Sequence, residues 1–153
     1  MLRNAIPEAL KSALKLQDKR TISTVRLIMA ALKDRDIAAR SKGDSEGIAD
    51  DEILQMLQTM VKQRRESISM YQEGGRLELA EQEAEEITVI EKFLPKQLND
   101  EEIKNIVDQV IRDIGAENLR DMGNVMGALR KVYSGQMDFG KAGALVKDRL
   151  ATG

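Results

Sequence analysis

The chain has 153 residues, of which 42% are apolar and 33% are charged, and its net charge is −2. This composition predicts a globular chain of one domain or two small ones with a real apolar core. The sequence contains no cysteine and no histidine, which excludes disulfides, thiolate chemistry and every catalytic arrangement that needs an imidazole. No apolar run approaches the roughly 18 residues of a membrane span, and no secretory pattern opens the chain, so we expect a cytoplasmic protein that contacts no membrane.

The small net charge hides an uneven distribution. Residues 1–42 carry ten Lys or Arg against four Asp or Glu, residues 43–95 carry five against thirteen, and the remaining residues carry nine of each. Opposite charges in neighbouring segments either complement each other in the fold or leave a basic patch for nucleic acid. The acidic total and the four aromatic residues favour complementation, because base stacking uses aromatic rings.

The first part of the chain predicts four helices, since every periodic segment has helical spacing. They span about residues 2–16, 21–40, 50–73 and 76–94. Asp50 and Asp51 offer N-caps and early negative charge for the third helix, and Gly74 and Gly75 end it. Pro95 ends the fourth helix, because a proline disfavours the helical conformation in the residue before it.

The remainder predicts three shorter helices at about residues 99–114, 121–133 and 138–150. Asn99, with Glu102 three residues later, resembles a capping box, and Gly115 ends the first of these helices. We therefore expect an all-α protein with an N-terminal four-helix domain over residues 1–94 and a compact three-helix domain over residues 95–153. A domain as small as the second is only marginally stable alone.

Gly123 and Gly127 lie inside the predicted helix 121–133 on one face. Each glycine is less favourable there than alanine by about 1 kcal/mol, so the pair predicts that something approaches this face closely. Two candidates remain open, the packing of another helix and the backbone of an RNA.

Four groups of residues, in order along the chain, carry a resemblance to a known protein family. They are Thr24–Leu27 with Ala30–Lys33, Lys62–Ser67, Phe93–Leu98 and Asp121–Leu129. Together they resemble the GatB/YqeY family, whose free-standing members are similar to the tail of the B subunit of tRNA-dependent amidotransferase. The resemblance implies two helical domains, the second being the module that contacts the tRNA elbow in that enzyme. The catalytic part of the subunit lies upstream of the tail and has no counterpart in this sequence.

The resemblance implies a helical accessory module that binds tRNA, the amidotransferase or an aminoacyl-tRNA synthetase. A protein-interaction adaptor unrelated to RNA and a component of a glutamine-dependent carbon–nitrogen ligase are the alternatives. Carboxylates are numerous, but no histidine, glycine-rich phosphate loop or ordered acidic triplet accompanies them. We therefore predict no catalytic residue, metal site or cofactor.

Five basic residues near the predicted C-terminal helices are candidates for phosphate contacts. They are Arg130, Lys131, Lys141, Lys147 and Arg149. Lys141 is the first choice, because it opens the last helix, where free backbone N–H groups also attract anions. An ordinary solvated surface is the alternative for the whole set.

Lys19, Arg26, Lys33 and Arg40 recur every seven residues and form a stripe on the second helix. Ion pairs with the acidic fourth helix are the favoured role of this stripe, and RNA contact is the alternative.

Arg64 interrupts the apolar stripe of the third helix. A charge in such a seam must be paired, so we expect a buried ion pair with Glu83 or Glu86 that fixes the register of the two helices.

Overall fold

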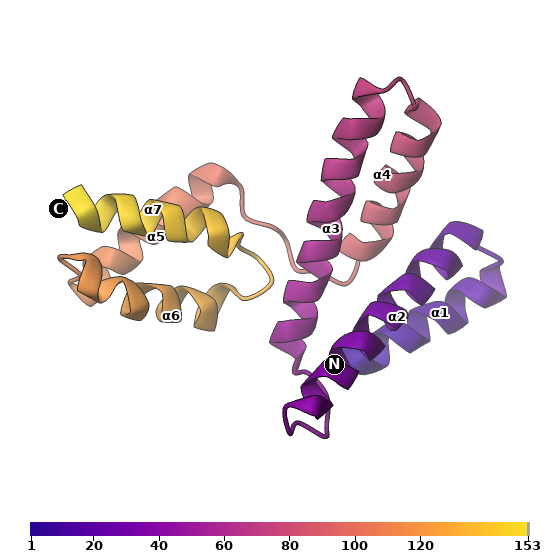
Figure 1. Cartoon of the computed structure of the whole chain (residues 1–153), viewed down its shortest axis with the longest axis horizontal. Helices are drawn as coiled ribbons and strands as arrows, with labels where there is room; N and C mark the ends of the chain where they lie inside the picture. The colour runs from indigo at the N-terminus through magenta and orange to yellow at the C-terminus, as the bar shows by residue number, and fades with distance from the viewer. Residues whose placement is uncertain (153) are drawn as a thin grey trace. The chain divides into compact units, whose positions relative to one another are not determined.

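The computed structural model describes residues 1–152, and all of its regular structure is helical (Figure 1). The elements are α1 (Leu2–Leu16), α2 (Lys19–Ser41), α3 (Asp50–Glu73), α4 (Leu77–Glu91), α5 (Asp100–Ile114), the 3-10 turn η1 (Leu119–Asp121), α6 (Met122–Tyr133) and α7 (Phe139–Thr152). The prediction of an all-α chain is confirmed for these residues. The helices gather into two compact units, one from Met1 to Pro95 and one from Lys96 onward.

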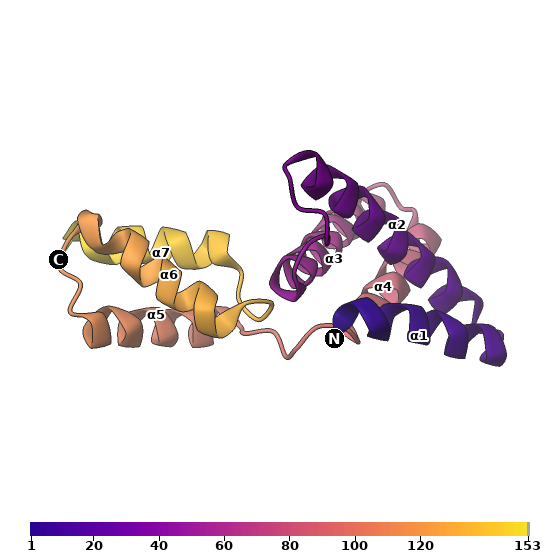
Figure 2. The same ribbon diagram turned by 90° about the horizontal axis from the view of Figure 1, so that it is seen from below.

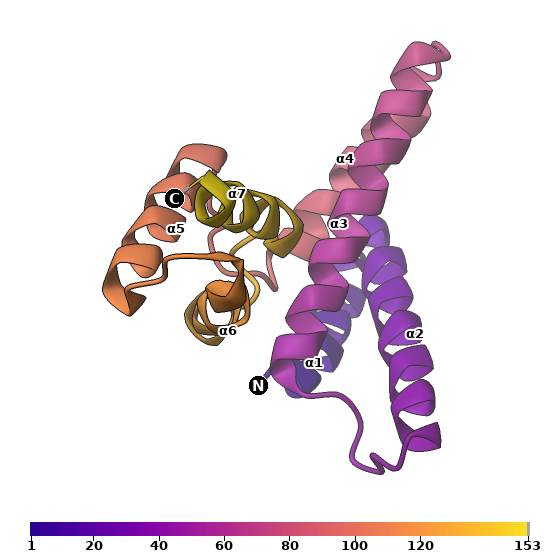
Figure 3. The same cartoon turned by 60° about the vertical axis from the view of Figure 1, so that its left-hand side comes forward.

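In the first unit, α1 and α2 form one antiparallel pair and α3 and α4 form another (Figure 1). Figure 3 shows the end of α3 and the start of α4 extending beyond α1 and α2. The buried residues of α3 accordingly stop at Val61, because only α4 covers the second half of the helix. The core of this unit consists of Ile6, Val25, Ile28, Leu32, Ile48, Ile53, Met56, Leu57, Met60, Val61, Ile87, Val89 and Ile90.

An ion pair ties the first two helices of this unit to the loop before α3. The Arg3 guanidinium donates to both carboxylate oxygens of Asp36, at 2.8 and 2.6 Å, and also to the carbonyl of Ile48, at 2.9 Å. The Ile48 N–H in turn donates to Asp36 Oδ1, at 2.9 Å. Gly47 lies against this network with a φ of +90°, and a Cβ there would meet the Asp36 carboxylate at 2.6 Å.

The second unit contains α5, α6 and α7 around its own core (Figure 2). That core consists of Ile103, Val107, Val125, Met126, Leu129, Met137, Ala142, Val146 and Leu150. The predicted capping box at the start of α5 is confirmed: Glu102 N–H donates to Asn99 Oδ1 at 2.8 Å, and Asn99 N–H donates to Glu102 Oε1 at 3.1 Å. Gly115 ends α5 in the left-handed conformation, with a φ of +74°.

Two local predictions in the first unit are wrong. Asp50 and Asp51 do not cap α3, because Ala49 takes the N-cap position and both aspartates lie in the first helical turn. Their charges there still favour the helix dipole. The fourth helix ends at Glu91 rather than Leu94, because the N–H groups of Phe93 and Leu94 bond to carbonyls only three residues back. The chain tightens into turns before Pro95.

Candidate nucleic-acid interface

The two glycines of α6 lie on its open side. Gly123 and Gly127 are exposed, whereas Val125, Met126 and Leu129 bury the opposite side in the core of the second unit. A Cβ built on either glycine would have no atom of the described chain within 4 Å. The alternative in which a neighbouring helix of the module packs on these glycines is therefore wrong. Their predicted role as a close-approach face remains a prediction.

The observed approach of α7 to α6 uses a different glycine. A Cβ on Gly143 of α7 would lie 3.7 Å from the terminal methyl of Met126. The sequence pattern does not single out this glycine, since it lies among small residues of a helix start. Packing of the module thus leaves the side of α6 that carries Gly123 and Gly127 uncovered by the described residues.

Basic side chains flank these glycines. Arg130 and Lys131 follow Gly127 by three and four residues, and both are exposed. The Arg130 guanidinium lies 5.8 Å from the centre of the Phe139 ring, a cation–π contact that restrains the side chain without neutralising it. Arg120, which is not among the residues predicted from the sequence, is exposed one turn before Gly123. Its spacing from Gly123 is the signal that could have identified it.

The sequence of α6 contains no aspartate or glutamate, whereas every other α-helix of the described residues contains at least one. Asp121, just before α6, accepts the N–H groups of Glu117 and Asn118 at 2.8 and 3.3 Å, and these bonds lower the pKa of its carboxyl group. The Asn118 side chain accepts the Arg120 N–H at 3.0 Å, which completes a capping box with Asp121. Our sequence predictions do not include this capping box, which fixes η1 and the start of α6. The charged side chains within α6 itself are therefore all basic, and Asp121 lies at its N-terminal end.

The start of α7 does not offer the free N–H groups that the sequence pattern predicts there. The Asp138 carboxylate accepts the N–H of Gly140 at 2.9 Å and that of Lys141 at 3.2 Å. The Lys141 ammonium lies 3.0 Å from Asp100 in an exposed ion pair. An aspartate thus takes the place predicted for a bound anion, which weakens the case for Lys141.

The two remaining basic candidates of α7 differ from each other. Arg149 donates to Asp108 on α5 at 2.8 Å, and this bond raises the pKa of its guanidinium. Lys147 is exposed, and no ion pair joins it to another residue in the described part of the chain. The structure therefore leaves Arg130, Lys131 and Lys147 available for phosphate contacts and engages Lys141 and Arg149 with acids.

In the first unit, the structure brings Arg64 together with both glutamates. Arg64 Nε lies 3.3 Å from Glu86 and 3.9 Å from Glu83, and the guanidinium also donates to the Met60 carbonyl at 3.2 Å. Only 14% of the Arg64 side chain and 9% of the Glu86 side chain are exposed. Burial and the neighbouring Glu86 raise the pKa of Glu83. This cluster joins α3 to α4.

The basic stripe of α2 does not pair with α4 as expected. Lys19, Arg26, Lys33 and Arg40 are exposed, and the described residues offer them no ion pair. Arg20 forms the salt bridge to α4 instead, to Glu85 at 3.0 Å, because it lies on the side of α2 that faces that helix. The stripe therefore stays open to solvent.

Residues 1–152 offer neither a metal centre nor a membrane span. No three potential metal-ligating side chains gather in that part of the chain. None of its helices combines the length and the apolar content that crossing a bilayer requires.

Comparison with known proteins finds three yeast relatives, of which two are named as mitochondrial proteins. A protein of Clavispora lusitaniae called "Altered inheritance of mitochondria protein 41, mitochondrial" is 27% identical over 153 residues, covering 97% of this chain and 85% of the relative. The protein of the same name from Kluyveromyces lactis is 27% identical over 72% of this chain, which spans 58% of that relative's length. An uncharacterized protein of Schizosaccharomyces pombe is 26% identical over 62% of this chain and 73% of its own length.

The names of the first two relatives overturn the expectation of a cytoplasmic protein, because both are named as mitochondrial. Fold and composition do not determine a compartment, since targeting segments are addresses that receptors read.

The family expected from the four groups of residues is confirmed by a match that spans nearly the whole chain. The model of the family described as "Yqey-like protein" matches residues 3–150. The chain therefore belongs to the Yqey-like protein family.

Proposed function

We propose that this protein is a tRNA-binding accessory module in tRNA-dependent amidation, and that α6 makes the RNA contact. The amidotransferase or an aminoacyl-tRNA synthetase is the proposed partner enzyme. In this proposal, carbon–nitrogen ligation with glutamine as the amide donor takes place in the partner. The family membership supports the proposal. The relation to the amidotransferase tail is what the resemblance of Phe93–Leu98 and Asp121–Leu129 implies.

One observation carries the proposal, the open face of α6, a helix that contains no acidic residue. Because Gly123 and Gly127 have no side chain and no neighbour within 4 Å, a sugar-phosphate backbone can come close to the helix. Arg120, Arg130 and Lys131 surround the glycines with charges that suit phosphate oxygens. A helix that served only to close a small core would gain about 1 kcal/mol from alanine at each glycine.

The proposal includes two domains, a four-helix domain over residues 1–94 and a three-helix domain over residues 95–153. Separate apolar cores support this division, one around Ile28 and Ile53 and one around Val107 and Leu129. The second domain would present the RNA-binding face, and its capped α5 and the capping box before α6 would hold that face in place.

The proposal is tested by titrating labelled total tRNA with the full chain and following fluorescence anisotropy at low and high salt. We expect binding at low salt that weakens as salt rises, because phosphate contacts release counterions. The double variant Arg130→Ala with Lys131→Ala should bind more weakly and reduce the slope of log affinity against log salt by about 2.

The matched control for this titration is Lys104→Ala with Arg112→Ala, which removes two exposed basic residues of α5. We expect the control to bind within about twofold of the wild type, a difference of about 0.4 kcal/mol. If wild-type protein does not bind tRNA at low salt, and a protein partner co-purifies despite nuclease treatment, the adaptor alternative replaces the proposal.

A further inference from the structure

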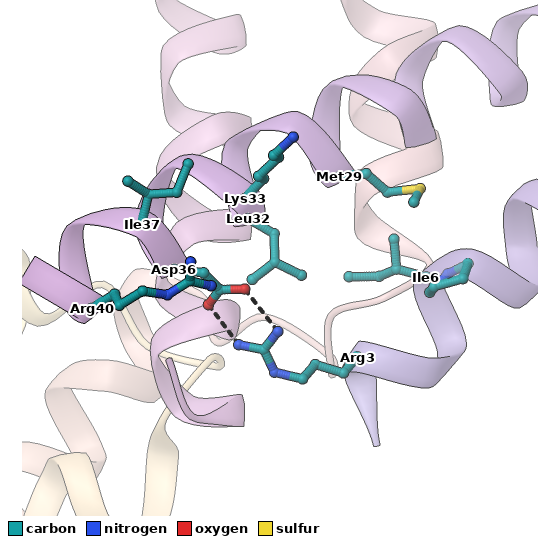
Figure 4. A pocket seen from close by; sticks show the side chains of 9 residues that line it. Arg3, Ile6, Met29, Leu32, Lys33, Asp36, Ile37 and Arg40 are labelled. Atoms are coloured by element: carbon teal, nitrogen blue, oxygen red, sulfur yellow. Dashed lines mark hydrogen bonds and ion pairs between the residues drawn. The ribbon is translucent and has the colours of Figure 1, made fainter. Parts of the chain in front are cut away.

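A hollow of about 300 Å³ lies between α1 and α2 of the first unit (Figure 4). Ile6 and Leu32 form its buried floor, and Met29 and Ile37 line it further out. Ile37 is 49% exposed, so the hollow opens to solvent. The seam between α1 and α2 thus contains an apolar recess that is open to solvent.

At one end of the hollow, an ion pair neutralises the Asp36 carboxylate. The Arg3 guanidinium donates two hydrogen bonds to the Asp36 carboxylate (Figure 4). Their lengths are 2.8 and 2.6 Å. The third bond from Arg3, to the Ile48 carbonyl at 2.9 Å, anchors the pair to the loop before α3. Asp36, the one acidic residue among those that line the hollow, is therefore already paired.

The rest of the rim is positive, although Arg40 also attracts the Asp36 carboxylate through space. Lys33 and Arg40 line the hollow, both are exposed, and neither forms an ion pair with any residue from 1 to 152. Arg26 and Lys19 continue the same side of α2 at intervals of seven residues. Four cations therefore follow the helix over a length of about 30 Å, and the last two of them lie at the apolar recess.

The spacing of these cations indicates a helical partner. Seven residues are two turns of a packed helix, so a helix lying along α2 meets one cation every two turns. A volume of about 300 Å³ is at the lower limit of pockets that enclose a drug-sized ligand, and it suits an apolar side chain that anchors a larger partner.

We infer that this groove of α1 and α2 binds an acidic amphipathic helix of a partner protein. An apolar side chain of that helix fills the hollow between Met29 and Ile37. Its carboxylates lie beside Lys33 and Arg40, and further carboxylates two turns apart reach Arg26 and Lys19. This interaction is independent of the RNA contact proposed for α6.

Two other anionic partners fit the groove less well. A nucleic acid would leave the apolar floor wet, and the residues that line the hollow include no aromatic ring on which a base could stack. An anionic bilayer favours apolar side chains that protrude into it, whereas Ile6 and Leu32 are recessed. The combination of a recess and regularly spaced cations favours a helix.

The inference is tested by nuclear magnetic resonance on the full chain labelled with nitrogen-15. The probe is a synthetic helix of three heptads with leucine at the core positions and glutamate beside them, and the control peptide carries lysine in place of each glutamate. We expect the acidic peptide to shift the amide signals of Met29, Lys33, Ile37 and Arg40, and the basic peptide to shift none of them.

Substitutions then assign the two parts of the contact. Arg40→Glu should weaken binding of the acidic peptide about tenfold, and Ile37→Glu should weaken it at least as much. Each substitution places a carboxylate against the bound helix. The control is Arg35→Glu, an exposed charge reversal on α2 outside the groove, which should change the affinity less than twofold, or about 0.4 kcal/mol. Circular dichroism of all three variants shows whether α2 remains folded.

Three results would overturn the inference. Equal binding of the acidic and basic peptides would remove the role of charge, and an equal loss in Arg35→Glu would remove the role of the groove. The third result is that the acidic peptide does not bind, while tRNA or phosphatidylglycerol vesicles shift the amide signals of Lys33 and Arg40. The basic stripe would then be assigned to RNA or to an anionic membrane instead.

Discussion

Two glycines, Gly127 and Gly47, have opposite surroundings in this protein. Gly127 lies on an open helix face, where an added Cβ would have no atom within 4 Å, whereas a Cβ on Gly47 would overlap the Arg3 and Asp36 side chains. Gly127→Ala should therefore raise the free energy of unfolding by up to about 1 kcal/mol, through helix propensity alone. Gly47→Ala should lower it by more than about 1 kcal/mol, since its φ is +90° and the ion pair must move.

Urea unfolding of the two glycine variants, followed by circular dichroism, checks this contrast. A loss of stability in Gly127→Ala would show that the face of α6 is covered within the protein, contrary to the structure.

The Asp36 carboxylate makes stability depend on pH in the acid range. Its pKa is lowered, first by the bond from Arg3 and then by the Ile48 N–H, so the folded protein binds this proton less readily than the unfolded chain. The stabilisation is complete above the unfolded value of about 4 and disappears as the pH falls through the lower folded value. Asp36→Asn should make the free energy of unfolding fall less steeply as the pH is lowered. Urea unfolding midpoints measured from pH 2 to pH 6, about two units either side of the unfolded pKa, would show this change.

A steeper fall in Asp36→Asn than in the wild type would contradict this role of Asp36. Asp113→Asn is the matched control, because it makes the same substitution at an exposed position of α5 whose carboxylate accepts a bond from Gln109 and none from an arginine among residues 1–152. This variant should keep the wild-type pH dependence.

At the scale of elements, the Arg64 cluster joins α3 to α4. Arg64→Met should destabilise the protein by about 3 kcal/mol, because it leaves Glu83 and Glu86 close together without a cation. Adding Glu86→Leu to Arg64→Met should recover most of that loss, since an apolar pair removes the unpaired buried charge. Thermal unfolding of both variants checks this, and a double variant no more stable than the single one would contradict the account.

Some elements could be predicted from the sequence because their signals are local. The capping box of Asn99 and Glu102 and the glycine that ends α5 need only a few neighbouring residues, and both formed as expected. Asp50 and Asp51 show the limit of such signals, since several adjacent residues could serve as the cap and the backbone selected Ala49.

Other features depend on tertiary arrangement and could not be read from spacing. Whether Gly123 and Gly127 are exposed depends on which side of α6 packs against α5 and α7. Helical spacing alone allows the glycines to lie on either the exposed or the packed side. Lys141 carries a pattern typical of an anion site, but Asp100, far away in the sequence, and Asp138 occupy its surroundings. The partner of α4 on α2 was likewise Arg20, one residue away from the predicted stripe.

At the scale of the whole molecule, the uneven charge of the sequence is only partly neutralised within the fold. Arg3, Arg20 and Arg64 pair with acids of the first unit, but the stripe on α2 remains exposed. The second unit has equal numbers of basic and acidic residues, yet α6 carries only basic ones. An acidic protein thus presents two separate basic strips, which we assign to different partners.

The most direct test of the central claim compares tRNA binding by Gly127→Leu and Ala144→Leu at low salt. Both add the same side chain to an exposed helix position, on α6 and α7 respectively, and neither changes a charge. If RNA approaches the glycine face, Gly127→Leu should lose at least about tenfold in affinity, or about 1.4 kcal/mol, with stability retained, and Ala144→Leu should bind like the wild type. Unchanged tRNA binding by Gly127→Leu would contradict the account.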